Sequence, residues 1–201
     1  FTFRQVSSKI NTTVFSMSII CLLLFFSITI FSSAWSINVS LKNDLVYGTP
    51  ADVVIASYAE ETKDVKTDIL DKVGYSTDNF SDYVEGNTYG FESVTVGSLL
   101  TPILDDVLKS YPYLMVDSYL PVMKISDYNK FASFYGRDTY TLKDDEFILV
   151  ADYPQMIEYE NMALEKGVTI KIGDKEYHNK YDECTEGLIS MSGNRSNTGI
   201  V

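Results

Sequence analysis

The feature that most constrains this chain is an uncharged stretch from Ile10 to Leu41, with charged residues on either side. Its apolar centre, residues 14–35 (VFSMSIICLLLFFSITIFSSAW), would form a helix about 33 Å long at 1.5 Å per residue. That length matches the hydrocarbon core of a bilayer, which is roughly 30 Å thick. Six of these residues are Ser or Thr, whose hydroxyl groups can donate to the helix's own carbonyl groups in lipid. The sequence therefore predicts a transmembrane helix over residues 14–35.

A secretory signal peptide and a buried helix of a soluble protein are the two alternatives. Ser32-Ser33-Ala34 does offer a small-x-small cleavage pattern of the kind found in signal peptides. The apolar stretch is longer than the roughly 7–15 residues of a signal-peptide core, however, and Trp35 stands where an interfacial aromatic residue belongs. We therefore favour the membrane span.

The charges are distributed unevenly around this stretch. Residues 1–39 carry Arg4 and Lys9 and no acid, whereas residues 40–201 carry 14 bases and 28 acids, a net charge of −14. By the positive-inside rule, residues 1–13 are expected to be cytoplasmic and residues 40–201 extracytoplasmic. So acidic a surface repels phosphate backbones, which argues against nucleic-acid binding.

The pattern after residue 40 predicts an α+β domain, in which strands and short helices alternate irregularly. Strands are expected at 51–56, 146–151, 188–191 and 200–201, within 80–96 and 113–125, and in a hairpin over 168–177 that turns at Gly173-Asp174. Helices are expected at 59–73, 101–108, 126–135 and 154–166, with Thr101 and Ser126 as N-caps and Gly74, Gly136 and Gly167 as stops. The fold class is thus an α+β domain tethered by one N-terminal transmembrane helix.

No motif for catalysis or for a cofactor stands out. The chain has no phosphate-binding glycine loop and no nucleophile elbow, and its single histidine, His178, has no ligand partners at a suitable spacing. Adjacent acids such as Asp105-Asp106 arise by chance among 28 carboxylates, and we interpret them as solvated surface. Cys21 and Cys184 are not expected to pair. We therefore predict no enzyme activity and no cofactor.

Two hypotheses remain on these grounds: a piece of a transport machine, or the sensor domain of a membrane receptor. The chain starts at Phe1 and stops within the apolar run Gly199-Ile200-Val201, so we expect it to be a fragment of a longer protein.

Several stretches resemble one transporter family. They are the segment FRQVSSKIN (3–11) leading into the apolar helix, ISDYNK (125–130), Gly136, LKDDEF (142–147), IKIGDKEY (170–177) and NTGIV (197–201). Together they resemble FtsX-like permeases, the membrane subunits of ABC transporters related to MacB and to BceB-type peptide-resistance permeases, mainly of Gram-positive bacteria. The likeness is loose over most of the chain and sharpest at the membrane segment and at SDYN.

The resemblance implies a function. Such permeases carry a large ectodomain after the first transmembrane helix, and a separate ATPase subunit drives ectodomain movement in export or in antimicrobial-peptide resistance. The segment before the helix would then lie near the ATPase, with Arg4, Gln5 and Lys9 as candidate contacts; simple positive-inside anchoring is the alternative for the two bases. A net charge of −14 would favour a cationic peptide as ligand, and solubility is the alternative explanation.

Overall fold

The computed structural model describes residues 2–57, 65, 69–190 and 197–201, with side chains from residue 13 onward. Contacts within the chain divide it into two units, Phe1–Val46 and Tyr47–Val201. The first unit consists almost entirely of one long helix. The second unit is a mixed domain of helices and two small sheets.

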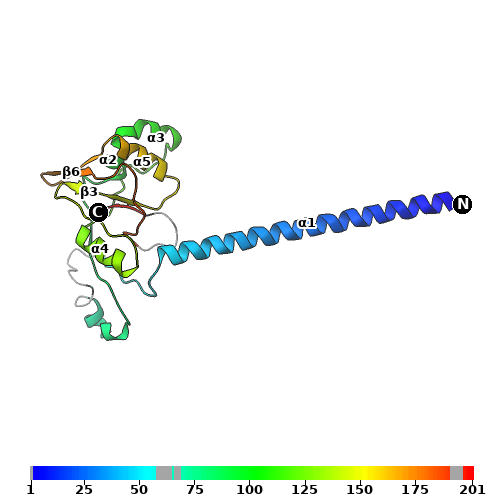
Figure 1. Ribbon diagram of the computed structural model, residues 1–201, viewed down its shortest axis with the longest axis horizontal. Coiled ribbons are helices and arrows are strands. Elements are labelled where there is room, and N and C mark those ends of the chain that lie inside the picture. Colours follow the sequence, from blue (N-terminus) through cyan, green and yellow to red (C-terminus); the bar gives the residue numbers. More distant parts are fainter. Residues whose placement is uncertain (1, 58–64, 66–68, 191–196) are drawn as a thin grey trace. The chain divides into compact units, whose positions relative to one another are not determined.

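Helix α1 (Thr2–Gly48) runs without interruption for 47 residues, about 70 Å at the usual helical rise (Figure 1). Within the described part of the chain, its segment Thr13–Gly48 is the one helix long and apolar enough to cross a membrane. The hydroxyl groups of Ser18, Ser27 and Thr29 donate to the carbonyl four residues earlier, at 2.9, 2.7 and 2.8 Å. The predicted internal satisfaction of these polar groups is confirmed.

The helix does not end where its apolar centre ends. It continues from Trp35 to Gly48, about 20 Å further, through a segment that includes Lys42 and Asp44. The second unit consequently begins at Tyr47, later than the residue 40 expected from the sequence. A bilayer of roughly 30 Å needs only about 20 helical residues, so α1 is long enough to extend well beyond it.

The second unit contains two sheets. One has the order β1-β2-β7-β4 and the other the order β3-β6-β5. In the first, β2 and β7 are parallel and the other pairs are antiparallel; in the second, β3 and β6 are parallel. The strands are β1 (Thr88–Tyr89), β2 (Val122–Met123), β3 (Glu146–Phe147), β4 (Leu149–Ala151), β5 (Thr169–Ile172), β6 (Lys175–Asn179) and β7 (Thr198–Ile200).

The predicted strand at 146–151 is divided between the two sheets. Its first half, β3, pairs with β6, and its second half, β4, pairs with β7. Phe147 and Leu149 pack into one buried cluster, whereas Ile148 and Val150 pack into another. Successive side chains of an extended chain point to opposite faces, so this short run lines both cores at once.

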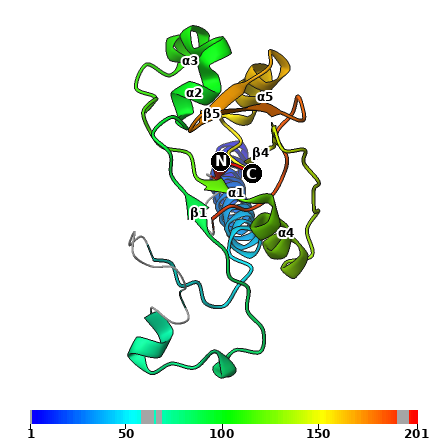
Figure 2. The ribbon, with the colours of Figure 1, turned by 90° about the vertical axis from the view of Figure 1, so that its left-hand side faces the viewer.

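Short helices lie beside these sheets: α2 (Val96–Leu100), α3 (Leu104–Ser110), α4 (Ile125–Phe134) and α5 (Ile157–Glu165). Helices α2 and α5 and strand β5 lie side by side around the larger core (Figure 2). Short 3-10 turns span Asp71–Val73, Thr77–Asn79 and Thr101–Ile103.

Two predicted N-caps are wrong. The helix expected at 101–108 is a 3-10 turn over Thr101–Ile103 followed by α3 from Leu104. The capping box of Thr95 and Ser98 starts a separate helix, α2, at Val96. The Thr101 hydroxyl instead donates to the carbonyl groups of Gly97 and Ser98. In α4 the N-cap position is Lys124, which makes no side-chain cap, so Ser126 lies inside the helix.

Of the other predicted turns, strands and helices, the structure confirms some and contradicts others. The hairpin is confirmed, with Ile172 opposite Lys175, and the three predicted glycine stops, Gly74, Gly136 and Gly167, all have positive φ. The predicted strand at 51–56 is wrong, since this segment is irregular with Val53 and Val54 exposed. Of the strand predicted at 188–191, residues 188–190 are irregular and residue 191 lies outside the described residues. The strands expected within 80–96 and 113–125 shrink to β1 and β2. Most of the helix expected at 59–73 lies outside the described residues.

Candidate functional site

The predicted ATPase-contact residues, Arg4, Gln5 and Lys9, belong to α1, but their side chains lie outside the described part of the structure. The sequence hypothesis for them therefore stays a prediction. The residues that resemble the permease family after the helix are described in full, and the site is built from them.

Arg137 contacts the C-terminal end of α1. Its Nη2 donates to the carbonyl oxygen of Tyr47 at 2.5 Å, and its guanidinium carbon lies 4.3 Å from the centre of the Tyr47 ring. The last carbonyl groups of a helix have no partner within the helix and carry the negative end of its dipole. A guanidinium group at this position satisfies one of them and also makes a cation–π contact.

The end of α4 sets the position of Arg137. Gly136 adopts φ +66°, and the backbone N–H groups of Gly136 and Arg137 donate to the carbonyls of Ser133 and Ala132 at 3.2 and 2.7 Å. This is the pair of hydrogen bonds of a Schellman motif, which favours glycine because the left-handed conformation is unstrained there. The glycine stop predicted from the sequence thus turns the chain so that the next side chain reaches Tyr47.

Helix α4, which carries SDYN (126–129), is fixed on both sides. Tyr128 and Ala132 are buried in the smaller core. Asp127 accepts from Lys130 at 2.9 Å and from the backbone N–H of Asn87 at 3.3 Å. The bond from the Lys130 ammonium group is the main reason that the pKa of Asp127 lies below its usual value.

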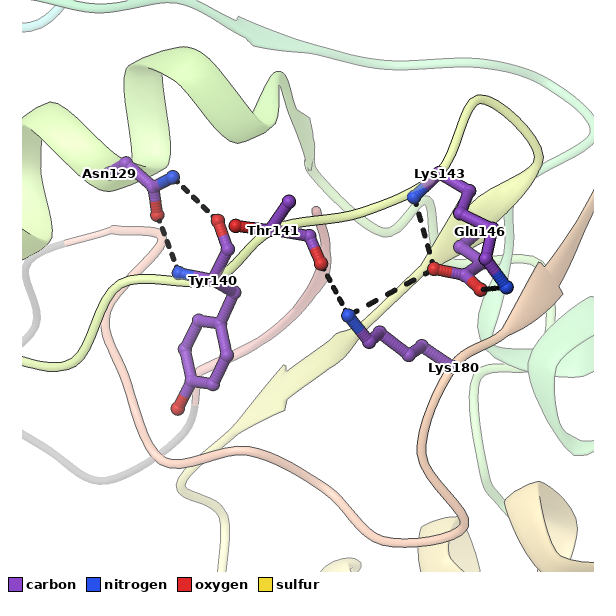
Figure 3. Close-up of polar contacts among 6 residues, drawn as sticks. All are labelled: Asn129, Tyr140, Thr141, Lys143, Glu146 and Lys180. Atoms are coloured by element: carbon purple, nitrogen blue, oxygen red, sulfur yellow. Dashed lines mark hydrogen bonds and ion pairs between the residues drawn. The ribbon is translucent and has the colours of Figure 1, made fainter.

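Asn129 holds the chain segment that follows the helix. Its Nδ2 donates to the carbonyl oxygen of Tyr140 at 2.7 Å, and the N–H of Tyr140 donates to Oδ1 of Asn129 at 2.9 Å (Figure 3). This side chain therefore pairs with both polar backbone groups of one residue, as a neighbouring strand would.

Glu146 holds the other end of the same segment. It accepts from the backbone N–H of Lys143 at 3.0 Å and pairs with the Lys143 ammonium group at 2.9 Å. Both contacts lower the pKa of Glu146, the side-chain bond more strongly. Lys180, 4.0 Å from the same carboxylate, donates to the carbonyl oxygen of Thr141 (Figure 3).

We call residues 137–145 the clamp loop, because side chains fix it at five points between α4 and β3. The contacts are Arg137 to Tyr47, Asn129 to Tyr140, Lys180 to Thr141, Glu146 to Lys143, and Lys175 to Asp144. Three residues from the resembling stretches, Asn129, Gly136 and Glu146, thus share one structural task. Sequence reasoning singled out neither Arg137 nor Lys180, although a basic residue directly after a helix-ending glycine was a usable signal.

The described residues contain no group of three or more His, Cys, Asp or Glu side chains placed to hold a metal ion. His178 lies exposed on β6, with Nδ1 3.1 Å from the Thr169 hydroxyl. Asp106 pairs with Lys109 on the surface, and Cys184 is not in a disulfide. The side-chain contacts around the clamp loop hold its backbone in place.

Comparison with known proteins gives no relatives: no protein-family model, no curated protein and no solved structure matches this chain.

Removing the Asn129 side chain should loosen the clamp loop. We expect Asn129→Ala to lower the free energy of unfolding by about 1–3 kcal/mol, because it leaves the N–H and C=O groups of Tyr140 without their partner. Asn129→Asp keeps the acceptor and should recover part of the loss. Thermal unfolding of the detergent-solubilised full chain measures both, and equal stability of the Ala variant and the unchanged protein would contradict this role.

Proposed function

We propose that this chain is the N-terminal part of the permease subunit of an FtsX-like ABC transporter. In this proposal residues 14–35 cross the cell membrane, residues 1–13 are cytoplasmic, and the domain that follows is extracytoplasmic. The observation that carries the proposal is α1, which continues unbroken from its apolar segment to Gly48 and whose residue Tyr47 accepts a hydrogen bond from Arg137.

A continuous helix suits the transmission of movement, because its backbone hydrogen bonds keep it stiff along its axis. A partner ATPase would hydrolyse ATP in the cytoplasm and contact α1 through Arg4, Gln5 and Lys9. Displacement of the helix would reach Tyr47 and pass through Arg137 to the clamp loop. The chain itself would be no enzyme and would need no cofactor; its partners would be the ATPase subunit and the lipid bilayer.

The five contacts of the clamp loop support this proposal. They connect one short segment to α4 through Asn129, to β3 through Glu146, and to the end of β6 through Lys180. A displacement at Arg137 would therefore move α4 and two strands of the β3-β6-β5 sheet together. Such a device serves export and antimicrobial-peptide resistance equally well, and we propose this pair of roles for the transporter.

The coding sequence downstream of residue 201 distinguishes a transporter from a sensor. We expect about three further hydrophobic spans after the ectodomain, no kinase module, and a neighbouring gene that encodes an ATPase with a phosphate-binding glycine loop. A single further span followed by a coiled-coil signalling helix would make the protein a receptor and would contradict the proposal.

Membrane topology provides an independent prediction. Ser8→Cys should be protected from a membrane-impermeant thiol reagent in intact cells, whereas Ser81→Cys, at an exposed position of the second unit, should be labelled. The unchanged protein reports the background from Cys21 and Cys184. Labelling of Ser8→Cys in intact cells would reverse the proposed orientation.

The acidity of residues 40–201 gives a prediction about ligands. If a net charge of −14 attracts cationic peptides, their binding to the full-length protein should weaken clearly as salt rises from 0.1 to 1 M. The Debye length falls from about 10 Å to about 3 Å over that range. Equal, salt-insensitive binding of neutral and cationic peptides would leave solubility as the explanation of the charge.

A further inference from the structure

We propose that the buried carboxyl group of Glu160 is a pH-sensitive latch, which fastens strand β7 to helix α5 when protonated and loosens when ionised. This proposal is independent of the transporter proposal, since it concerns only contacts inside the second unit.

Glu160 lies on the buried face of α5, with 3% of its surface exposed. Its Oε1 accepts a hydrogen bond from the hydroxyl group of Thr198, the first residue of β7, at 3.0 Å. Its Oε2 lies 3.7 Å from the thiol of Cys184. One carboxyl group thus connects α5 to β7 and to the segment before the bridge residue Thr185.

The start of β7 is held by a second buried carboxyl group. Asp152, directly after β4, accepts from the backbone N–H of Asn197 at 2.7 Å and from its Nδ2 at 3.0 Å. Ser190 donates to the side-chain oxygen of Asn197 at 2.7 Å. Because β7 lies between β2 and β4, these contacts fix an inner strand of its sheet.

The hydrogen bonds from Thr198 and the Cys184 thiol favour the ionised form of Glu160, but the charge of Asp152 disfavours it. Asp152 repels a second negative charge, and the Cys184 thiol, which Glu183 also faces, can only become an anion. None of the ion pairs among the described residues involves Glu160. Thr198 and the weak thiol donor are its side-chain hydrogen-bond partners in this part of the structure.

Burial is the main cause that raises the pKa of Glu160 to about 7, with Asp152 adding to it. Burial, and then Glu160 itself, also raises the pKa of the Cys184 thiol. Above neutral pH the ionised carboxylate gains solvation by leaving its site, which separates α5 from Thr198. If Glu160 has its ordinary pKa in the opened state, the ratio of opened to closed molecules rises about tenfold between pH 6 and pH 8.

Hydrogen exchange of the full-length protein in detergent tests the latch. After correction for intrinsic exchange rates, the equilibrium constant for opening, measured at the backbone amides of β4 and β7, should rise about tenfold from pH 6 to pH 8. In Glu160→Gln, which cannot ionise, opening should be the same at both pH values. Glu158→Gln, on an exposed position of the same helix, is the matched control and should behave as the unchanged protein.

Equal protection at the two pH values in the unchanged protein would overturn the proposal, and so would a tenfold change that persists in Glu160→Gln. A second variant tests the same site without altering the carboxyl group. Thr198→Val removes the hydrogen bond from β7 to the Glu160 carboxyl group, so the β7 amides should open more at pH 6 than in the unchanged protein. Equal opening of the two proteins at pH 6 would also contradict the latch.

Discussion

Glu160→Gln is expected to stabilise the protein, and to do so more at high pH. The folded state binds the Glu160 proton more tightly than the unfolded chain does, because burial raises the pKa from 4.5 to about 7. Stability due to this group is therefore present at low pH and lost as pH rises through about 7. At 1.36 kcal/mol per pKa unit, the gain from the substitution should grow by about 2.5 kcal/mol between pH 5 and pH 8.

Thermal unfolding of the full chain at several pH values measures this gain. Glu158→Gln is the control, since it removes the same charge from an exposed position two residues away. The account requires the two curves of stability against pH to differ in slope between about pH 5 and pH 8. Parallel curves for the two variants would show that Glu160 does not titrate in this range.

Gly199→Ala should be strongly destabilising. A Cβ atom at Gly199 would lie 2.5 Å from Cδ1 of Ile189, 2.8 Å from the carbonyl oxygen of Pro121 and 3.0 Å from its Cγ. The backbone contact cannot yield by a change of rotamer, and β7 is paired on both sides. Overpacking of this kind costs about 1–3 kcal/mol, and here the expected cost is at the upper end.

Gly90→Ala is the matched control for that substitution. An added Cβ atom at Gly90 meets nothing within 4 Å, and its φ is not positive. Both variants are compared by thermal unfolding at one pH. If Gly199→Ala unfolds at the same temperature as Gly90→Ala, the close packing of β7 against Pro121 is contradicted.

The sequence predicted correctly those elements that depend on residues close together in the chain. The uncharged run predicted the apolar part of α1, Gly173-Asp174 predicted the hairpin, and Gly136 and Gly167 predicted the ends of α4 and α5. Each of these depends on residues within a few positions of one another. The extension of α1 to Gly48 was missed, because polar residues after Trp35 resemble a loop when no packing partner is visible.

Long-range pairing was not predictable in the same way. The strand expected at 51–56 has the right composition, but no strand among the described residues pairs with it. Thr198–Ile200 becomes an inner strand because β2 and β4 flank it. The same limit applies to the clamp loop. Arg137 and Lys180 bind backbone carbonyls 90 and 39 positions away, and no local pattern encodes such a contact.

The most direct test of the permease proposal is purification of the tagged full-length protein from membranes in mild detergent. We predict that an ABC-type ATPase co-purifies in near-stoichiometric amount and that the preparation hydrolyses ATP. Replacing Arg4, Gln5 and Lys9 with alanine should reduce the co-purified ATPase, while alanine at Ser7 and Ser8 should leave it unchanged. A preparation of the unchanged protein that contains no such ATPase would contradict the account.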